Sequence, residues 1–359
     1  MDKFLFVSNE NIDSFFKAVT HSYALYLPVK NSSGQSEFSR YEDGVKMSDD
    51  LNTVRSAKDF FFPQVESLAS FKRDGLHVEA TRAPLDDEDF AVFGVRACDA
   101  ASFNALDRVF MHIKPEDTYY KNRREHSTII TLACNADKMA NECFCKLWKI
   151  DPANPAGDVQ AWQTKDGYTL QPLTDKGTAF VEKVSSALNE ASAEQKAAVD
   201  SLKKEISERA EKQAFANEKL EHFTGKNMMK VFNLPIWENL SETCLACGSC
   251  TFVCPTCQCY DIRDFSLGTP TGSKVERFRC WDSCMYSDFT KMAAANPRTT
   301  HAQRFRQRFM HKLMYYPMDY DGAFGCVGCG RCLKKCPQKL NIVKVMRAIN
   351  SAMDSGEAK

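Results

Sequence analysis

Short apolar runs and helical repeats alternate along the first half of the chain. The runs FAVFGV (90–95) and STIITLAC (127–134) are apolar and rich in β-branched residues, which indicates buried strands. Between them, DAASFNALDRVF (99–110) repeats apolar residues near helical spacing. Upstream, NIDSFFKAVTHSYALYLPV predicts a helix followed by a strand. Because a strand–helix–strand order favours parallel pairing, we expect residues 1–173 to form an α/β domain.

The next segment, residues 174–225, changes character. It is rich in Ala, Glu and Lys, and its apolar positions fall at helical spacing: Phe180, Val184 and Leu188, then Val199, Leu202, Ile206 and Ala210. This pattern predicts two amphipathic helices. Their charged side chains are interpreted as a solvated face, with bracing of the domains or contact with a partner as the alternative.

Residues 226–359 hold two cysteine motifs that are separated by about seventy residues. The interval includes THAQRFRQRFMHKLMYY, which predicts a helix. A long helical interval favours an α-helical two-cluster ferredoxin domain over the compact β-framed kind. The whole chain is therefore predicted to be α+β, with an N-terminal α/β domain, an amphipathic helical segment and an α-helical C-terminal domain.

Charge and composition narrow the range of functions. The formal net charge of the 359 residues is +0, so there is no electrostatic case for a nucleic acid partner or an anionic membrane surface. No apolar run is long enough to span a bilayer. The start, MDKFLFVSNENIDSFF, lacks the features of a signal peptide, so we expect a cytoplasmic protein.

The 16 cysteines are the strongest compositional signal. In a reducing cytoplasm, tight groups of cysteines indicate metal binding rather than disulfides. Both CLACGSCTFVCP and CVGCGRCLKKCP read C-x2-C-x2-C-x3-C-P, in which the fourth cysteine typically ligates the other cluster of a pair. We therefore assign one [4Fe–4S] cluster to Cys244, Cys247, Cys250 and Cys336, and a second to Cys326, Cys329, Cys332 and Cys254. Structural zinc at the C-x2-C pairs is the main alternative.

Four of the remaining cysteines lie in the N-terminal domain: Cys98, Cys134, Cys143 and Cys145. Cys98 and Cys134 each follow a predicted strand, so parallel pairing would bring them to one edge of the sheet. Two thiols one residue apart in ECFC complete a predicted third [4Fe–4S] site. The alternative is two core thiols beside a chance C-x-C. Asp99 is predicted to cap a helix that begins at Ala100, with ligation as its alternative.

The last four cysteines follow the first motif: Cys257, Cys259, Cys280 and Cys284. Their spacings, C-x-C and C-x3-C, match no standard ferredoxin run. They suggest a fourth cluster, while a redox-active thiol pair, zinc or simple packing remain open. A basic helix follows with Arg298, Arg304, Arg306, Arg308 and Lys312. These side chains either raise the reduction potential of a nearby cluster or dock an acidic partner, or they form an ordinary exposed helix face, which we favour.

Several longer stretches resemble a known family: GVRACDAASFNALDRVF, YYKNRRE, ECFC, CLACGSCTFVCPTCQC, WDSC, QRFRQRFMHKL and GCVGCGRCLKKCP. They are similar to the β subunit of sulfhydrogenases, which are sulfur-reducing [NiFe] hydrogenases, and to the corresponding iron–sulfur subunit of anaerobic sulfite reductase. The resemblance covers about residues 94–340. Outside the two ferredoxin motifs, every cysteine except Cys280 matches a cysteine position of the family: Cys98, Cys134, Cys143, Cys145, Cys257, Cys259 and Cys284. The chain departs from it after ECFC, where KLWKIDP replaces a glycine-rich stretch.

This resemblance implies an electron-transfer subunit between a partner subunit that binds flavin and NAD(P)H and a catalytic reductase or hydrogenase subunit. The sequence holds no GxGxxG or Walker motif and no evident catalytic triad, so we predict no catalytic residues and no nucleotide bound in those ways. One rival hypothesis makes the chain a reductase in its own right, with Cys257, Cys259, Cys280 and Cys284 binding a sulfur substrate or an unusual cluster. Another places a flavin in the N-terminal domain.

Overall fold

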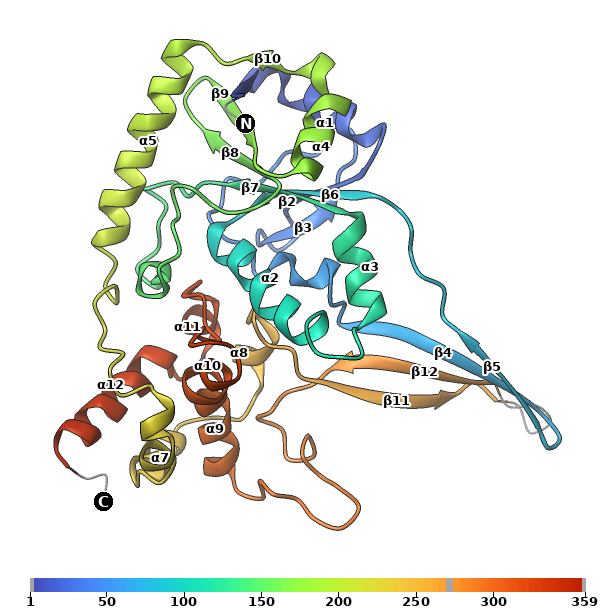
Figure 1. Ribbon diagram of the computed structural model, residues 1–359, viewed down its shortest axis with the longest axis vertical. Helices are drawn as coiled ribbons and strands as arrows, with labels where there is room; N and C mark the ends of the chain where they lie inside the picture. Colours follow the sequence, from blue (N-terminus) through green and yellow to red (C-terminus); the bar gives the residue numbers. More distant parts are fainter. Residues whose placement is uncertain (1–2, 269–273, 357–359) are drawn as a thin grey trace.

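The computed structural model describes residues 3–268 and 274–356 and confirms an α+β fold (Figure 1). A large mixed sheet forms the N-terminal part, and the helices of the C-terminal part lie below it in this view. A second sheet projects sideways as a long arm. In the described ranges, no helix combines the length and the apolar character needed to cross a membrane.

The large sheet has eight strands in the order β10-β1-β9-β8-β7-β6-β2-β3. Its members are β1 Leu5–Ser8, β2 Ala24–Lys30, β3 Ser36–Arg40, β6 Phe90–Val95, β7 Ser127–Leu132, β8 Val159–Gln163, β9 Gly167–Pro172 and β10 Asn189–Glu190. Strands β2, β6, β7 and β8 run parallel, as the strand–helix–strand pattern predicts, and the outer strands pair antiparallel. The two predicted buried strands are β6 and β7, and every residue of both is buried.

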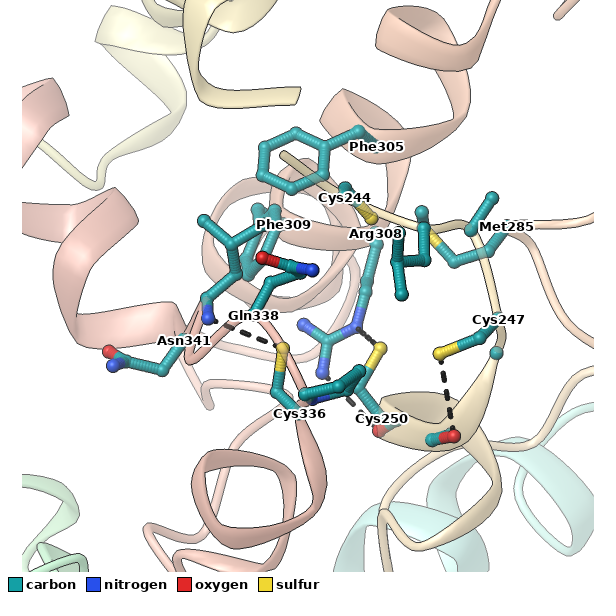
Figure 2. Close-up of a pocket in the computed structure, with 16 residues that line it drawn as sticks. Cys244, Cys247, Cys250, Met285, Phe305, Arg308, Phe309, Cys336, Gln338 and Asn341 are labelled. Carbon is teal, nitrogen blue, oxygen red and sulfur yellow. Dashed lines mark hydrogen bonds between the residues drawn. The ribbon is translucent and has the colours of Figure 1, made fainter. Parts of the chain in front are cut away.

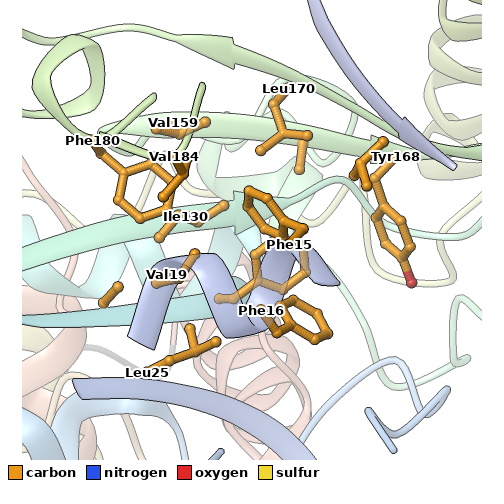
Figure 3. Close-up of a cluster of buried hydrophobic side chains, with 14 of the residues drawn as sticks. Phe15, Phe16, Val19, Leu25, Ile130, Val159, Tyr168, Leu170, Phe180 and Val184 are labelled. Carbon is orange, nitrogen blue, oxygen red and sulfur yellow. The ribbon is translucent and has the colours of Figure 1, made fainter. Parts of the chain in front are cut away.

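Helices cover both faces of this sheet. On one face, α1 (Ile12–Thr20) and α4 (Asp175–Lys183) bury Phe15, Phe16 and Phe180 against the strands (Figure 3). On the other, α2 (Ala97–Phe110) packs with α3 (Thr118–His126) and the 3-10 turn η2 (Ala57–Phe60). The first amphipathic helix is shorter than predicted, because α4 ends at Lys183 and Leu188 lies beyond it in extended conformation.

The second sheet joins distant parts of the chain. Its order is β11-β12-β4-β5, formed by β4 Val65–Asp74, β5 His77–Arg82, β11 Tyr260–Ser266 and β12 Lys274–Trp281. The β11–β12 hairpin, which the sequence pattern does not predict, lies inside the otherwise helical C-terminal part and pairs with β4. The boundaries of 1–173, 174–225 and 226–359 remain a prediction, and this sheet crosses two of those segments.

The second amphipathic helix, α5 (Ala193–Glu211), runs down the side of the molecule (Figure 1) and buries Val199, Ile206 and Ala210, as predicted. The C-terminal helices share a core that includes Trp237, Phe305 and Ile349. They are α6 Met228–Phe232, α7 Ile236–Ser241, α8 Ser249–Phe252, α9 His301–Met310, α10 Tyr316–Asp319, α11 Arg331–Lys335 and α12 Ile342–Asp354. A π-helical turn, η6 (His311–Tyr315), joins α9 to α10. Short 3-10 turns are η1 Asn9–Asn11, η3 Cys145–Trp148, η4 Ser185–Ala187 and η5 Gly225–Asn227.

Candidate metal centres

The four cysteines assigned to the first cluster line one cavity (Figure 2). They are Cys244, Cys247 and Cys250, around the start of α8, and Cys336, directly after α11. Gly248 precedes α8 with φ +73°, a conformation that glycine adopts readily and that lets the loop turn back on itself. The structure thus brings together the four thiols that the motif spacing pairs.

Nitrogen donors already point at two of these sulfurs. Nε of Arg308 donates to Sγ of Cys250 at 3.0 Å (Figure 2). The backbone N–H of Leu340 donates to Sγ of Cys336 at 3.2 Å. Hydrogen bonding with Ser249 lowers the pKa of Cys247, the exposed member of the set. At Cys247 this favours the thiolate, which is the form that ligates a metal.

The four cysteines assigned to the second cluster line a separate cavity: Cys254, Cys326, Cys329 and Cys332. Burial raises the pKa of the Cys326 thiol to about 12 and raises those of Cys329 and Cys332 as well. A buried thiol keeps its proton unless a cation compensates the negative charge of the thiolate. Iron would supply that cation, so the donor set suits a cluster site.

Two glycines of the second motif allow it to pack directly against the N-terminal part. A Cβ at Gly328 (φ +63°) would lie 2.5 Å from the carbonyl carbon and oxygen of Phe144. A Cβ at Gly330 would lie 2.7 Å from the carbonyl oxygen of Glu142. The backbone N–H of Phe144 donates to the carbonyl of Gly328 at 2.9 Å. The loop that carries Cys143 and Cys145 therefore contacts the second thiol set.

The four N-terminal cysteines also come together. Cys98 lies in the first turn of α2, and Cys134 follows β7. Cys143 lies in the loop that leads into η3, and Cys145 is the first residue of that turn. Cys145 interacts electrostatically with each of the other three. Burial raises the pKa of Cys134 to about 12 and that of Cys143 to about 11. The predicted third set is thus a compact group of three buried cysteines and the partly buried Cys134, at the edge where β6 and β7 end.

Two polar side chains that the sequence pattern does not single out support this group. Nε2 of Gln213, which follows α5, donates to Sγ of Cys145 at 3.5 Å. Arg96 is buried beside Cys98 and Cys134, and its guanidinium donates to three backbone carbonyls, including that of Ala133 at 2.6 Å. Arg96 lies in the RACD stretch, and its place in that motif is the one sequence signal that points to it.

Of the last four cysteines, the structure gathers three. Cys259 and Cys284 interact with each other, and Cys257 interacts with Cys259 and with Cys254 of the second set. Cys280 lies on β12 opposite Asp261 of β11, where its side chain faces Asp261, Arg263 and Asp282. The contacts therefore join Cys257, Cys259 and Cys284 next to Cys254, and they place Cys280 among charged residues of the arm.

Two buried lysines, Lys312 and Lys58, lie beside Cys254 and Cys257, where the second and fourth cysteine sets meet. Nζ of Lys312, in the π-helical turn, donates to Oγ1 of Thr256 at 2.9 Å and to the carbonyl of Gly325 at 2.8 Å. Burial acts against its charge, yet the nearby Cys254 and Cys257 raise its pKa above the ordinary value. π-helical turns are frequent at functional sites, and this one places an ammonium group beside the thiols.

Lys58 is another residue of the candidate site that gives no sequence signal. It is 2% exposed, and its Nζ donates to the carbonyls of Cys254 (3.2 Å) and Cys257 (3.1 Å). The same atom lies 3.5 Å from the centroid of the Trp281 ring, a cation–π contact. Lys58 comes from the N-terminal half and Trp281 from the arm, so this contact is set by tertiary packing that a local pattern does not reveal.

The basic residues of α9 and η6 are not all exposed, although the sequence favoured an exposed helix face. Arg308 and Lys312 are buried, at 3% and 5% exposure, and both adjoin the thiol sets. Arg304 donates to the carbonyls of Met285, Arg298 and Thr299, and Arg306 stacks on the ring of Phe232. The exposed-face interpretation is therefore wrong for Arg308 and Lys312, because one side of α9 packs onto the cysteine motifs.

The capping role predicted for Asp99 is also wrong. Arg96 is the N-cap of α2, and Asp99 lies within the first turn, where it forms a buried ion pair with Arg331. The helix begins two residues before Asp99, so the Asp99 carboxylate does not cap it and instead reaches Arg331 in the second cysteine motif. Arg331 itself stands between two predicted ligands in GCGRCL, and that position is the sequence signal that points to it.

Comparison with known proteins agrees with this arrangement. Residues 243–340 match the family described as a 4Fe-4S dicluster domain, and this range includes all eight cysteines of the two ferredoxin-type sets. The chain is also 29% identical to sulfhydrogenase 2 subunit beta of Pyrococcus furiosus, over 98% of this chain and 99% of that protein. The predicted resemblance is confirmed: the chain carries a 4Fe-4S dicluster domain and is similar along nearly its whole length to a sulfhydrogenase β subunit.

Proposed function

We propose that this chain is an iron–sulfur subunit that relays electrons between a partner that binds flavin and NAD(P)H and a catalytic reductase or hydrogenase subunit. The observation that carries the proposal is the pair of cavities, each lined by the four cysteines of one predicted ligand set. When bound, a [4Fe–4S] cluster supplies one-electron oxidation and reduction. Similarity to a protein named as a sulfhydrogenase subunit supports partner redox subunits.

The proposed ligands fall into four groups. Cys244, Cys247, Cys250 and Cys336 would hold the first cluster, and Cys254, Cys326, Cys329 and Cys332 the second. A third site would use Cys98, Cys134, Cys143 and Cys145. A fourth would use Cys257, Cys259 and Cys284, with Cys280 the member that the contacts support least.

The rest of the chain prepares these sites. Most of the third set is buried, and the second set is partly shielded from solvent. The buried cations Arg96, Arg308 and Lys312 offset the negative charge that thiolates bring to these sites. Unpaired buried charge is costly, so these cations favour thiolates over thiols at the sites. The chemistry expected of these residues is the holding and tuning of metal centres rather than bond making.

Iron and sulfide analysis of protein purified without oxygen tests the metal assignment. We expect iron and acid-labile sulfide in equal amounts, with about 8, 12 or 16 iron atoms per chain for two, three or four clusters. Zinc without acid-labile sulfide would overturn the proposal. Reduced protein should also give electron paramagnetic resonance (EPR) signals of reduced clusters.

Purification of the complex tests the relay. We expect subunits that bind flavin and NAD(P)H, and a reductase or hydrogenase subunit, to co-purify with the tagged chain. The chain alone should accept electrons from dithionite and pass them to an artificial acceptor. Turnover of sulfite or elemental sulfur by the chain alone would instead support the rival hypothesis of a reductase.

A further inference from the structure

Arg308, on α9, lines both ferredoxin-type cavities. Its side chain is 3% exposed, so its guanidinium is held between the two thiol sets rather than in solvent. Around it lie cysteines of both sets, with Cys250 of the first set and Cys332 and Cys254 of the second interacting with its charge. A single buried cation therefore faces both predicted clusters.

Two of its three nitrogens serve the first set. Nε donates to Sγ of Cys250 at 3.0 Å, and Nη2 donates to the carbonyl of Cys250 at 3.3 Å (Figure 2). These two contacts fix the plane of the guanidinium and hence the direction of its remaining nitrogen. The rigid fork of arginine makes this possible, whereas the single ammonium of lysine does not fix a plane.

The third nitrogen has no partner. Nη1 of Arg308 is buried and makes no hydrogen bond to any residue in the described ranges. A buried donor without an acceptor is costly, and such groups in native structures call for an explanation. Sulfur atoms of a cluster in the second cavity, which Arg308 also lines, would supply the missing acceptor.

We propose that Arg308 is one hydrogen-bond donor shared by both ferredoxin-type clusters and that it raises the reduction potential of each. The inference rests on the proposed function, since it requires a cluster in both cavities. The physical reason is that a reduced cluster carries more negative charge than an oxidised one, so a fixed cation and its N–H donors stabilise the reduced form more. Arg308 acts by donating hydrogen bonds to sulfur atoms of both sites.

The chain offers a matched control on the same helix. Arg304 is one turn away from Arg308, and its guanidinium bonds only backbone carbonyls in the described structure, those of Met285, Arg298 and Thr299. Replacing either residue by glutamine removes one positive charge from α9. Only the replacement at Arg308 removes donors from the cluster cavities.

The experiment is a redox titration followed by EPR, with wild type, Arg308→Gln, Arg308→Lys and Arg304→Gln at equal iron content. We expect Arg308→Gln to lower the midpoint potentials of both ferredoxin-type clusters. Arg308→Lys should restore part of the loss because it keeps the charge, and Arg304→Gln should match wild type. A change at one cluster only, at neither, or equally in Arg304→Gln would overturn the inference.

A second measurement covers the case in which Arg308→Gln fails to bind iron. Protein labelled with 15N-arginine is reduced, and pulsed EPR detects nitrogen coupled to each cluster signal in wild type and in Arg308→Lys. Coupling that disappears from both signals in Arg308→Lys supports the shared donor, and coupling that changes at only one signal contradicts it. Failure of the proposed function looks different: wild type itself would lack the iron and sulfide of two clusters, about 8 iron atoms per chain.

Discussion

Arg331 and Asp99 form a buried two-point ion pair that joins the second cysteine motif to α2. Nη2 of Arg331 bonds Oδ2 of Asp99 at 2.8 Å, and Nη1 bonds Oδ1, with the side chains 4% and 1% exposed. Nε of Arg331 also donates to the carbonyl of Thr53 at 2.9 Å. The pair therefore fastens the ferredoxin-type part to α2, whose first turn carries Cys98.

Replacing Asp99 by alanine should strongly destabilise the protein. The change leaves the Arg331 guanidinium buried without its carboxylate, and breaking a buried pair in this way typically costs about 3–5 kcal/mol. Denaturant unfolding under anaerobic conditions would measure the loss. Asp264→Ala is the matched control, because Asp264 pairs with Arg277 on the exposed arm. Equal stability of the two variants would contradict the importance of the buried pair.

Serine replacements separate the cysteines of the fourth proposed site. If Cys257 and Cys259 hold a cluster, replacing both should lower iron by about four atoms per chain. Cys280→Ser should leave iron content unchanged, since Cys280 faces charged residues of the arm. Iron and sulfide analysis gives the answer. A loss of iron in Cys280→Ser would restore Cys280 to the ligand set, and unchanged iron in the double variant would remove the site.

Alanine substitutions at Gly328 and Gly322 separate the cost of a steric clash from the cost of an unfavourable backbone conformation. Both have positive φ, but a Cβ at Gly322 would meet nothing within 4 Å, whereas one at Gly328 would meet the backbone of Phe144. Gly322→Ala should cost about 1–2 kcal/mol from backbone strain alone. Gly328→Ala should cost clearly more and should also reduce iron bound at the N-terminal set. Unfolding curves would measure the loss of stability, and iron analysis would measure the loss of iron. Equal losses of stability in the two variants would show that the backbone around Phe144 moves easily to make room for the added Cβ.

His311 should make stability depend on pH below neutrality. Burial, reinforced by Lys312 and Arg298, lowers its pKa to about 4, below the ordinary value of 6.5. As pH falls through 6.5, His311 binds a proton in the unfolded chain but stays neutral in the folded chain. The contribution of His311 to stability is therefore fully present above pH 6.5 and is lost progressively as pH falls toward 4. Between pH 7.5 and 5.5 this loss amounts to about 1 kcal/mol.

The variant His311→Gln should remove that part of the pH dependence. Unfolding measured at pH 7.5 and 5.5 would show a smaller difference in stability than in wild type. His77→Gln, at an exposed position on β5, is the control and should behave as wild type. The same pH dependence in all three proteins would show that His311 is not its source.

The elements that could be predicted from sequence are those whose pattern is local. β6 and β7 are buried on both faces and read as continuous apolar runs, and α5 repeats its buried residues at helical spacing. The cysteine motifs are also local patterns, because the spacing of their cysteines determines which thiols can ligate one cluster. The first and second thiol sets therefore meet at the cavities that the spacing predicted.

What the sequence did not reveal depends on contacts between distant segments. The exposed strand β11 and the partly buried β12 are rich in charge and carry little apolar alternation. The hairpin they form is held by the pairing of β12 with β4. Lys58 joins the cysteine region only because the chain returns to it about 200 residues later. Likewise, nothing in the basic helix distinguishes Arg308 from Arg304 until α9 is seen packed on the first motif.

The pairing of β4 with β12 has a consequence for the order in which the protein is made. Asp74 at the end of β4 and Lys274 at the start of β12 are 200 residues apart, so β4 leaves the ribosome long before its partner exists. Until then β4 and β5 can form only a two-stranded hairpin, which is marginally stable in water. The arm thus marks a late step of synthesis: it closes only after the first cysteine motif, which precedes β12 in the chain, has emerged.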